Sequence, residues 1–225
     1  MVSNAVGTEC VETPADLDEI GIAAIDIGAG GGPLDPFYPY HSNYDPYHWM
    51  VRRILPTTRE ILADFILQSK FGDPSFHTHK VMGQYLTLLV YHIASDPVSP
   101  LSPSGYVPEL NTYLATLNDT LGSSSFDLDL SPLTSEITTF ASAAEKFTAL
   151  RDDAVAINNS NLLITQNHKA LDFSRGCTSQ GGLPTRDFYR HTIFAPGRDT
   201  GYVPVTFPGI TESITIDKDE KLANE

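Results

Sequence analysis

Apolar residues recur at helical spacing between residues 70 and 175, in runs separated by proline, glycine and serine. Helices are predicted to begin near Pro74, Pro108, Pro132 and Ala154. The segment Ser95–Pro103 contains three prolines and ends the first helix, and Gly122–Ser125 ends the second. Short connections between successive helices favour antiparallel neighbours, so the pattern predicts an antiparallel helical bundle.

The pattern differs at both ends of the bundle. Ile20–Ile27 is a short apolar run that predicts a buried strand, and a glycine-rich stretch follows it. That stretch is interpreted as a loop rather than a phosphate-binding turn, because Pro33 and Pro36 stand where a helix would begin. Beyond the bundle, residues 176–212 are rich in Gly, Pro and aromatic residues and predict an ordered return loop with short extended segments. The charged tail Asp217–Glu225 is expected to fray.

Charge and composition reduce the number of functional classes to which the protein could belong. The formal net charge of −14 disfavours nucleic-acid partners and anionic membrane surfaces, both of which select basic patches. No apolar run reaches the ~20 residues that span a bilayer, and the acidic N-terminus lacks the apolar core of a signal peptide. No targeting signal is therefore expected in this chain, and its compartment stays unknown.

Two further sequence features depend on the compartment. Cys10 and Cys177 are interpreted as two free thiols, with a bridge between them left open. The triplets that begin at Asn118 and Asn158 are N-glycosylation acceptor sequences, which are used only in a secretory compartment.

Candidate metal-binding and catalytic residues are concentrated in Phe37–Met50, whose sequence is FYPYHSNYDPYHWM. His41 lies at its centre, but zinc needs three or four ligands, so the local sequence favours a packed or hydrogen-bonded histidine. His77 and His79 would face different directions on a helix and are predicted to be solvated. The sequence contains no HExxH motif and no carboxylate pair with a recognisable acid–base spacing, so no catalytic residue is predicted.

A cluster of basic residues is notable because the chain is otherwise acidic. Four basic residues lie within a span of thirteen, namely Arg186, Arg190, His191 and Arg198. Such a cluster suits an anionic ligand such as a carboxylate. The alternative is that these residues pair with Asp187, Asp199 or carboxylates of the bundle. The sequence leaves both interpretations open.

These stretches together carry a family resemblance over about Ile20–Ile214. GLPTRDFYRHTIFAP followed by GYVPVTFPGI resembles the C-terminal signature of the glutamate carboxypeptidase and transferrin receptor family of zinc exopeptidase relatives. FYPYHSNYDPYHWM followed by KFGDPSFH is similar to the passage from the peptidase domain of that family into its helical dimerisation domain. Val51–Ser69 interrupts a junction that the family makes directly, and we interpret it as an insertion.

The resemblance implies a mainly α fold, an antiparallel helical bundle with a short α/β remnant of the peptidase domain at the N-terminus. The implied divisions are 1–50 for the remnant, 51–69 for the insertion, 70–175 for the helical dimerisation domain and 176–225 for the return loop and a shortened C-terminal segment.

The family's functional residues carry over to three positions. Family enzymes hold two zinc ions, and the last zinc-binding histidine, in a Tyr-His-Ser sequence, corresponds to His41. Tyr40 would contact substrate beside it, and Tyr202 matches the tyrosine that binds the terminal carboxylate of the substrate. The lysine of that family pair falls on Gly201, which weakens the expectation of a glutamate preference.

The other zinc ligands and the general-base glutamate lie upstream in the family, outside this sequence. We therefore predict that this chain alone binds no stoichiometric zinc and has no peptidase activity, with a peptide substrate only in a full-length parent. It would be the C-terminal part of a two-zinc exopeptidase and form a homodimer through the helical domain. The alternatives are a non-catalytic, receptor-like dimerisation module and a truncated product without function.

Overall fold

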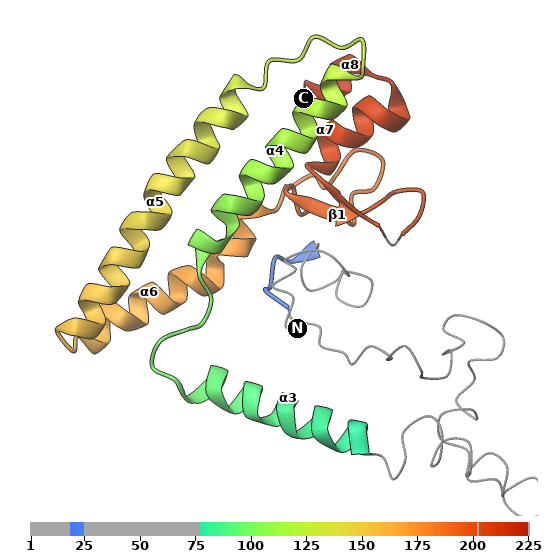
Figure 1. Cartoon of the computed structure of the whole chain (residues 1–225). Coiled ribbons are helices and arrows are strands. Elements are labelled where there is room, and N and C mark those ends of the chain that lie inside the picture. Colours follow the sequence, from blue (N-terminus) through green and yellow to red (C-terminus); the bar gives the residue numbers. More distant parts are fainter. Residues whose placement is uncertain (1–18, 25–76, 202, 225) are drawn as a thin grey trace, which may run out of the picture. The chain divides into compact units, whose positions relative to one another are not determined.

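The computed structural model describes residues 19–24, 77–201 and 203–224. The chain divides into two compact units, one formed by residues 1–26 and 97–225 and the other by residues 27–96. Each unit is described by itself. Within the described residues the protein is mainly helical, as predicted, with one small two-stranded sheet (Figure 1).

Helix α3, His77–Ser95, is the described part of the second unit, and it confirms the first predicted helix. Its predicted start at Asp73-Pro74 lies outside the described residues. None of its residues is buried, although much of its surface is apolar. The exposed large apolar residues of α3 are Val81, Tyr85, Leu86, Leu88, Val90, Tyr91 and Ile93. Among the described helices, none is both long and apolar enough to cross a membrane.

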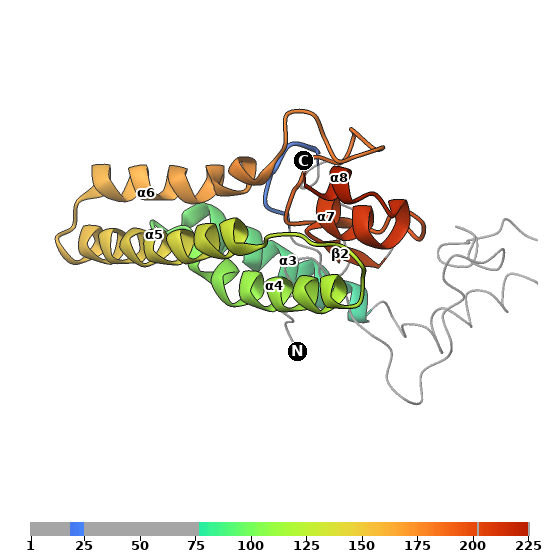
Figure 2. The same ribbon diagram turned by 90° about the horizontal axis from the view of Figure 1, so that it is seen from above.

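Three helices form the bundle of the first unit: α4 (Tyr106–Gly122), α5 (Ser131–Ala156) and α6 (Ser160–Asp172). A short 3₁₀ turn, Pro103–Gly105, leads into α4. Helix α5 packs against both α4 and α6, and successive helices run in opposite directions (Figures 1 and 2). The antiparallel arrangement predicted for this part of the chain is confirmed.

The boundary between α5 and α6 was predicted wrongly. The fourth helix was expected from Ala154, but Ala154 is a buried residue in the last turn of α5, and α6 begins at Ser160. Asn158 breaks the helical path because its φ of 53° lies in the left-handed region, which asparagine tolerates better than most residues. The Asn159 side chain then accepts a hydrogen bond from the Leu162 amide at 3.1 Å and caps α6.

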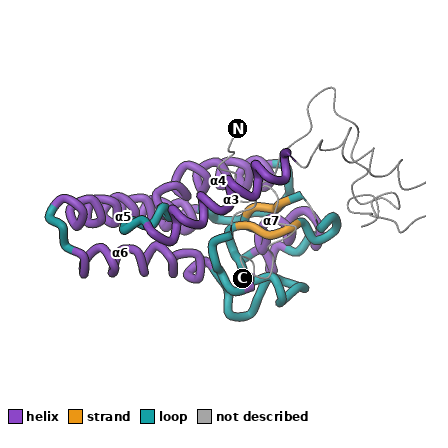
Figure 3. Tube along the Cα trace, turned by 90° about the horizontal axis from the view of Figure 1, so that it is seen from below, coloured by secondary structure: helices purple, strands orange, loops and turns teal. Residues whose placement is uncertain are grey.

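The return loop contains the short extended segments that the sequence predicted. After a 3₁₀ turn, Phe173–Cys177, the chain forms β1 (Phe194–Pro196) and β2 (Pro204–Thr206). The two strands are antiparallel, with Ala195 opposite Val205. Figure 3 shows this small sheet beside helix α7, Pro208–Glu212, which packs against β2.

The end of the described chain is also ordered, so the prediction of a frayed tail was wrong for residues 217–224. A π-helical turn, η6 (Ser213–Asp217), leads into helix α8 (Glu220–Ala223). Asp219 caps α8 by accepting a hydrogen bond from the Leu222 amide at 3.1 Å. Ala223 is 9% exposed and belongs to the core, so apolar packing offsets the charge of its neighbours.

The main core joins residues that are far apart in the sequence. Its buried members come from α4, α5 and the C-terminal segment, namely Leu110, Leu117, Ile137, Phe207, Ile214 and Ala223. Phe207 makes an edge-to-face contact with Tyr113 of α4, with ring centroids 6.4 Å apart. The return segment therefore seals one end of the bundle and is held there by apolar burial.

Residues 20–24 do not form the predicted strand. Ile20 and Ile22 are 49% and 40% exposed, and Gly21 lies instead against the backbone of Ser174 and Arg175. A strand needs a hydrogen-bonded neighbour, and the described sheet contains only β1 and β2. The rest of the predicted strand lies outside the described residues.

Candidate functional site

The residues predicted from the family resemblance fall outside the described part of the chain. Tyr40, His41 and Tyr202 are among these residues, as is the proposed insertion Val51–Ser69. Their assignments therefore remain predictions. The described residues on both sides of position 202, however, form a well-defined polar site, which can be built from its backbone upward.

The turn between β1 and β2 is closed by backbone hydrogen bonds. The Gly197 amide donates to the Val203 carbonyl at 2.8 Å, and the Gly201 amide donates to the Gly197 carbonyl at 2.8 Å. Gly201 has a φ of 68°, a left-handed conformation that glycine adopts without steric cost. The described residues of this connection, 197–201 and 203, therefore form a compact hairpin loop.

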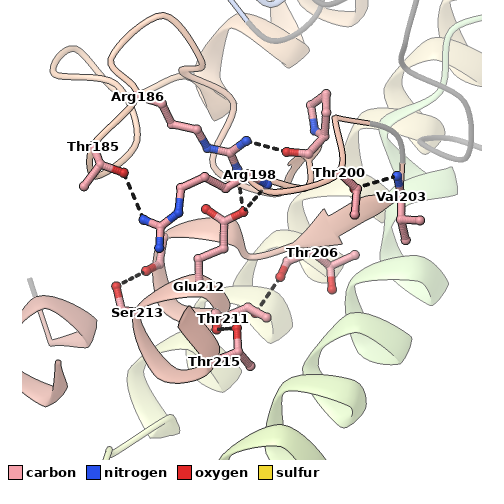
Figure 4. A network of polar contacts seen from close by, with 12 residues as sticks. Thr185, Arg186, Arg198, Thr200, Val203, Thr206, Thr211, Glu212, Ser213 and Thr215 are labelled. Atoms are coloured by element: carbon pink, nitrogen blue, oxygen red, sulfur yellow. Dashed lines mark hydrogen bonds and ion pairs between the residues drawn. The ribbon is translucent and has the colours of Figure 1, made fainter. Parts of the chain in front are cut away.

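Arg186 forms the buried centre of the polar network. Its Nη2 atom lies 2.8 Å from Oε1 of Glu212, and the two side chains are only 11% and 5% exposed. Its Nη1 atom donates to the Pro196 carbonyl at the end of β1, and its guanidinium lies over the Tyr189 ring, 5.0 Å from the ring centre. Arg186 thus ties the return loop, the sheet and α7 together (Figure 4).

Arg198 extends the network to the π-helical turn. It binds both carboxylate oxygens of Asp217, at 2.8 and 3.1 Å, and also donates to the Thr185 hydroxyl at 2.9 Å. Its backbone amide donates to Glu212 Oε1 at 3.1 Å, so Glu212 receives bonds from two arginines. The hydrogen bonds to Asp217 raise the pKa of Arg198, and the guanidinium remains charged.

These contacts decide between the two interpretations of the basic cluster. Arg190 also has a carboxylate neighbour, Glu19 at 3.8 Å, and it donates to the Gln180 carbonyl at 3.0 Å. All three arginines therefore lie within ion-pair distance of a carboxylate. The pairing interpretation is right, but the partners are Glu212, Asp217 and Glu19 rather than Asp187, Asp199 or the bundle.

The fourth member of the cluster, His191, is not a surface cation. It is completely buried and stacks on the Phe194 ring, with centroids 4.1 Å apart. Neither ring nitrogen has a hydrogen-bond partner of acceptable geometry in the described structure. Burial lowers the pKa of His191 to about 4, and the nearby Phe194 backbone offsets this only in part. The ring is therefore neutral at physiological pH.

The remaining predicted groups behave as surface or inert residues. His77 and His79 are exposed at the start of α3, as predicted. Cys177 is a free thiol, and burial raises its pKa to about 11, so it is a poor nucleophile and metal ligand. Among the described residues, no group of three or more His, Cys, Asp or Glu side chains is placed to hold a metal ion. The described residues therefore do not by themselves fit a zinc centre.

The sequence reasoning missed the acidic partners in this network. Glu212 and Asp217 are five residues apart, a spacing that points to different sides of an ordinary α-helix. The π-helical turn has i to i+5 hydrogen bonding and lets both residues serve the same arginine-rich loop. One sequence signal could have identified these two partners. They are acidic residues in a segment that also contains Ile210, Ile214 and Ile216, and a carboxylate in an apolar segment usually has a partner.

Comparison with known proteins identifies the region that contains this network. Residues 128–225 match the family described as the transferrin receptor-like dimerisation domain. The chain carries a transferrin receptor-like dimerisation domain. The matched region runs from just before α5 through α8, so the polar network and the return loop are parts of this domain.

Curated relatives extend the similarity beyond the dimerisation domain. A probable glutamate carboxypeptidase of Arthroderma benhamiae is 45% identical over 197 residues, which cover 86% of this chain and 25% of the relative. The probable glutamate carboxypeptidase LAMP1 of Arabidopsis thaliana is 28% identical over 200 residues, which cover 88% of this chain and 25% of the relative. The aminopeptidase NAALADL1 of Rattus norvegicus is 26% identical over 167 residues, which cover 72% of this chain and 22% of the relative.

The chain thus spans about a quarter of the length of the curated relatives it matches. The resemblance to the C-terminal part of a glutamate carboxypeptidase, inferred from the sequence motifs, is confirmed.

Proposed function

We propose that this chain assembles into a homodimer through its dimerisation domain and forms one part of a two-zinc exopeptidase of the carboxypeptidase type. The observation that carries the proposal is the 45% identity to a probable glutamate carboxypeptidase over 86% of this chain. The match of residues 128–225 to the dimerisation domain supports the mode of assembly.

The proposed site contributions follow the family resemblance. His41 would supply one zinc-binding nitrogen, Tyr40 would contact substrate beside it, and Tyr202 would bind a terminal carboxylate. The network of Arg186, Arg198, Glu212 and Asp217 fixes the described residues that precede and follow Tyr202 in the sequence. The network consists of ion pairs, so its role in this proposal is structural rather than catalytic.

The substrate is proposed only as the terminus of a peptide. The names of the relatives include both carboxypeptidases and an aminopeptidase. The residue before Tyr202 is Gly201, so the lysine that the family pairs with this tyrosine is absent at that position. A specific preference for C-terminal glutamate is therefore not part of the proposal.

Zinc titration tests the predicted metal behaviour of this chain alone. We expect isothermal calorimetry with ZnCl₂ to show no stoichiometric site, because one histidine does not make a zinc centre. A site of micromolar or tighter affinity in the wild-type chain would contradict the prediction that this chain alone binds no stoichiometric zinc. A site that also persisted after His41→Ala would contradict the assignment of His41 as the zinc ligand. His79→Ala serves as the matched control, since His79 is an exposed histidine of α3.

Sedimentation equilibrium over a range of protein concentrations tests the proposed dimer. Helix α3 lies outside the matched residues 128–225 but within the region 70–175 that the sequence predicts to dimerise, and it is a suitable test surface because it is apolar and exposes Leu88 to 59%. Replacing Leu88 by Arg is expected to raise the dimer dissociation constant at least about tenfold, since a charge would enter a desolvated contact. Gln84→Arg, at an exposed polar position of the same helix, is the control.

A strictly monomeric wild-type chain at all concentrations would contradict the dimer. Equal dissociation constants for the wild type and Leu88→Arg would leave the dimer intact but exclude α3 from its interface.

A further inference from the structure

The two N-glycosylation triplets of the sequence occupy very different structural settings. Asn118-Asp119-Thr120 lies within α4, whereas Asn158-Asn159-Ser160 forms the turn from α5 to α6. An acceptor asparagine needs an amide nitrogen that an enzyme can reach, together with a hydroxyl two residues later. The surroundings of these two groups therefore distinguish the triplets.

In the first triplet both required groups are bound to the helix. The Asn118 Nδ2 atom, which would carry the glycan, donates to the Leu114 carbonyl at 2.9 Å. The Thr120 hydroxyl donates to the Thr116 carbonyl at 2.9 Å. These hydrogen bonds keep the two side chains along the α4 surface.

In the second triplet both required groups face solvent. Every residue from Val155 to Ser160 is exposed, and Ile157 next to the acceptor is 67% exposed. The side chains of Asn158 and Ser160 make no hydrogen bond with a described residue, while the intervening Asn159 is occupied in capping α6. The left-handed backbone of Asn158 lifts it out of both helices, so a large group attached there displaces no packed side chain.

We propose that Asn158 is an N-glycosylation site and that this chain receives a glycan there in the lumen of the secretory pathway. In the transfer, Asn158 Nδ2 forms a bond to the anomeric carbon of an oligosaccharide carried on a lipid diphosphate. The bond between that carbon and the phosphate oxygen breaks, the lipid diphosphate leaves with the electron pair, and the amide nitrogen loses one proton. The donor and its transferase are supplied by the compartment.

The test uses the full chain, secreted from yeast behind a cleavable leader and analysed by intact mass before and after treatment with peptide-N-glycosidase F. The enzyme converts a glycosylated asparagine to aspartate, so peptide mapping of the wild type locates the site without relying on any variant. We expect a single glycan, with the conversion at residue 158.

Four variants sharpen the assignment. Asn158→Gln and Ser160→Ala are expected to abolish the glycan, whereas Ser160→Thr retains a hydroxyl and is expected to keep it. Asn118→Gln is the matched control and is expected to leave the glycan mass unchanged. A secreted wild-type chain without a glycan, conversion at residue 118, or an unchanged glycan in Asn158→Gln would each overturn the proposal.

Discussion

Among single residues, His191 gives the folded domain a sensitivity to acid. Above a pH of about 6.5 the ring is neutral in both the folded and unfolded states, so it contributes no pH dependence. As the pH falls below that value, the unfolded chain binds a proton, whereas the buried ring resists protonation until its pKa of about 4 is reached. The free energy of unfolding should therefore decrease as the pH falls between these two values.

We expect this loss to be about 3 kcal/mol between pH 6.5 and 4, from the separation of the two pKa values. Urea unfolding at closely spaced pH values measures it. His191→Phe keeps an aromatic ring against Phe194 and should flatten the dependence in this range. His168→Phe, at an exposed histidine of α6, is the matched control. An unchanged slope in His191→Phe would contradict the assignment.

Gly182 provides a second prediction at the residue scale. Its φ is +77°, and a Cβ atom there would lie 2.3 Å from the Asp187 Cα atom, which belongs to the backbone and cannot easily move. Gly182→Ala should lower the free energy of unfolding by at least about 3 kcal/mol, from backbone strain and the clash together. Thermal or urea denaturation measures the change.

Gly201→Ala is the matched control for Gly182→Ala. Gly201 also has a left-handed φ, of +68°, but a Cβ atom there meets nothing within 4 Å. Only the conformational cost remains, on the order of 1 kcal/mol. Equal losses in the two variants would show that the contact with Asp187 does not matter.

The residue scale is where the sequence predicted least. The clustering of Arg186, Arg190 and Arg198 was visible, and the sequence correctly offered ion pairing as one interpretation. The identity of the partners was not visible, because the pairing of Glu212 with Arg186 depends on tertiary packing, and Asp217 is placed by a turn with π-helical geometry. The burial of His191 was hidden too, since its environment depends on tertiary packing and not on its neighbours in sequence.

At the scale of elements, two ion pairs of different burial join α7 to Arg186 of the return loop and η6 to Arg198 of the hairpin loop. Glu212 is almost completely buried beside Arg186, whereas Arg198 and Asp217 are 18% and 23% exposed. Removing one partner of a buried pair leaves an uncompensated charge, and a partly exposed pair is screened by water. The two pairs should therefore respond differently to neutralising substitutions.

Glu212→Gln is expected to destabilise the domain by about 3 kcal/mol, and Asp217→Asn by about 1 kcal/mol or less. Hydrogen exchange of the Arg198 amide, which donates to Glu212, should accelerate more in the first variant. Denaturation and exchange measured on the same samples test both statements. The reverse order of the two losses would contradict the burial argument.

Sequence periodicity predicted the elements themselves more successfully. Helices α3, α4 and α5 follow their apolar spacing, and Pro and Gly marked the breaks around α4. The turn at 157–159 was missed because apolar residues continue through Val155 and Ile157 without glycine or proline. The helix α8 was missed because a single buried alanine, Ala223, outweighs a charged local sequence.

Over the whole molecule, the core couples the bundle to the C-terminal segment. Leu117 of α4 is 1% exposed and shares one cluster with Phe207 and Ile214. Leu117→Ala should therefore reduce the free energy of unfolding by about 2–5 kcal/mol, through lost apolar burial and the cavity left behind. Because one core serves both parts, they should continue to unfold in a single transition.

Urea denaturation followed by far-ultraviolet and tyrosine near-ultraviolet circular dichroism measures this change. Leu150→Ala on α5 is the control, because Leu150 is 45% exposed and should lose well under 1 kcal/mol. Two separate transitions in the wild type would show that the bundle and the return segment are independent.

The shared core also has a consequence for synthesis of the protein. The apolar face of α4 is translated about a hundred residues before Ile214 and Ala223, which cover it. At the usual elongation rate of about 5–20 residues per second, this face remains uncovered for roughly 5–20 seconds on each ribosome. The nascent helices therefore need protection from aggregation during this interval, and codon choice between α4 and α8 sets its duration.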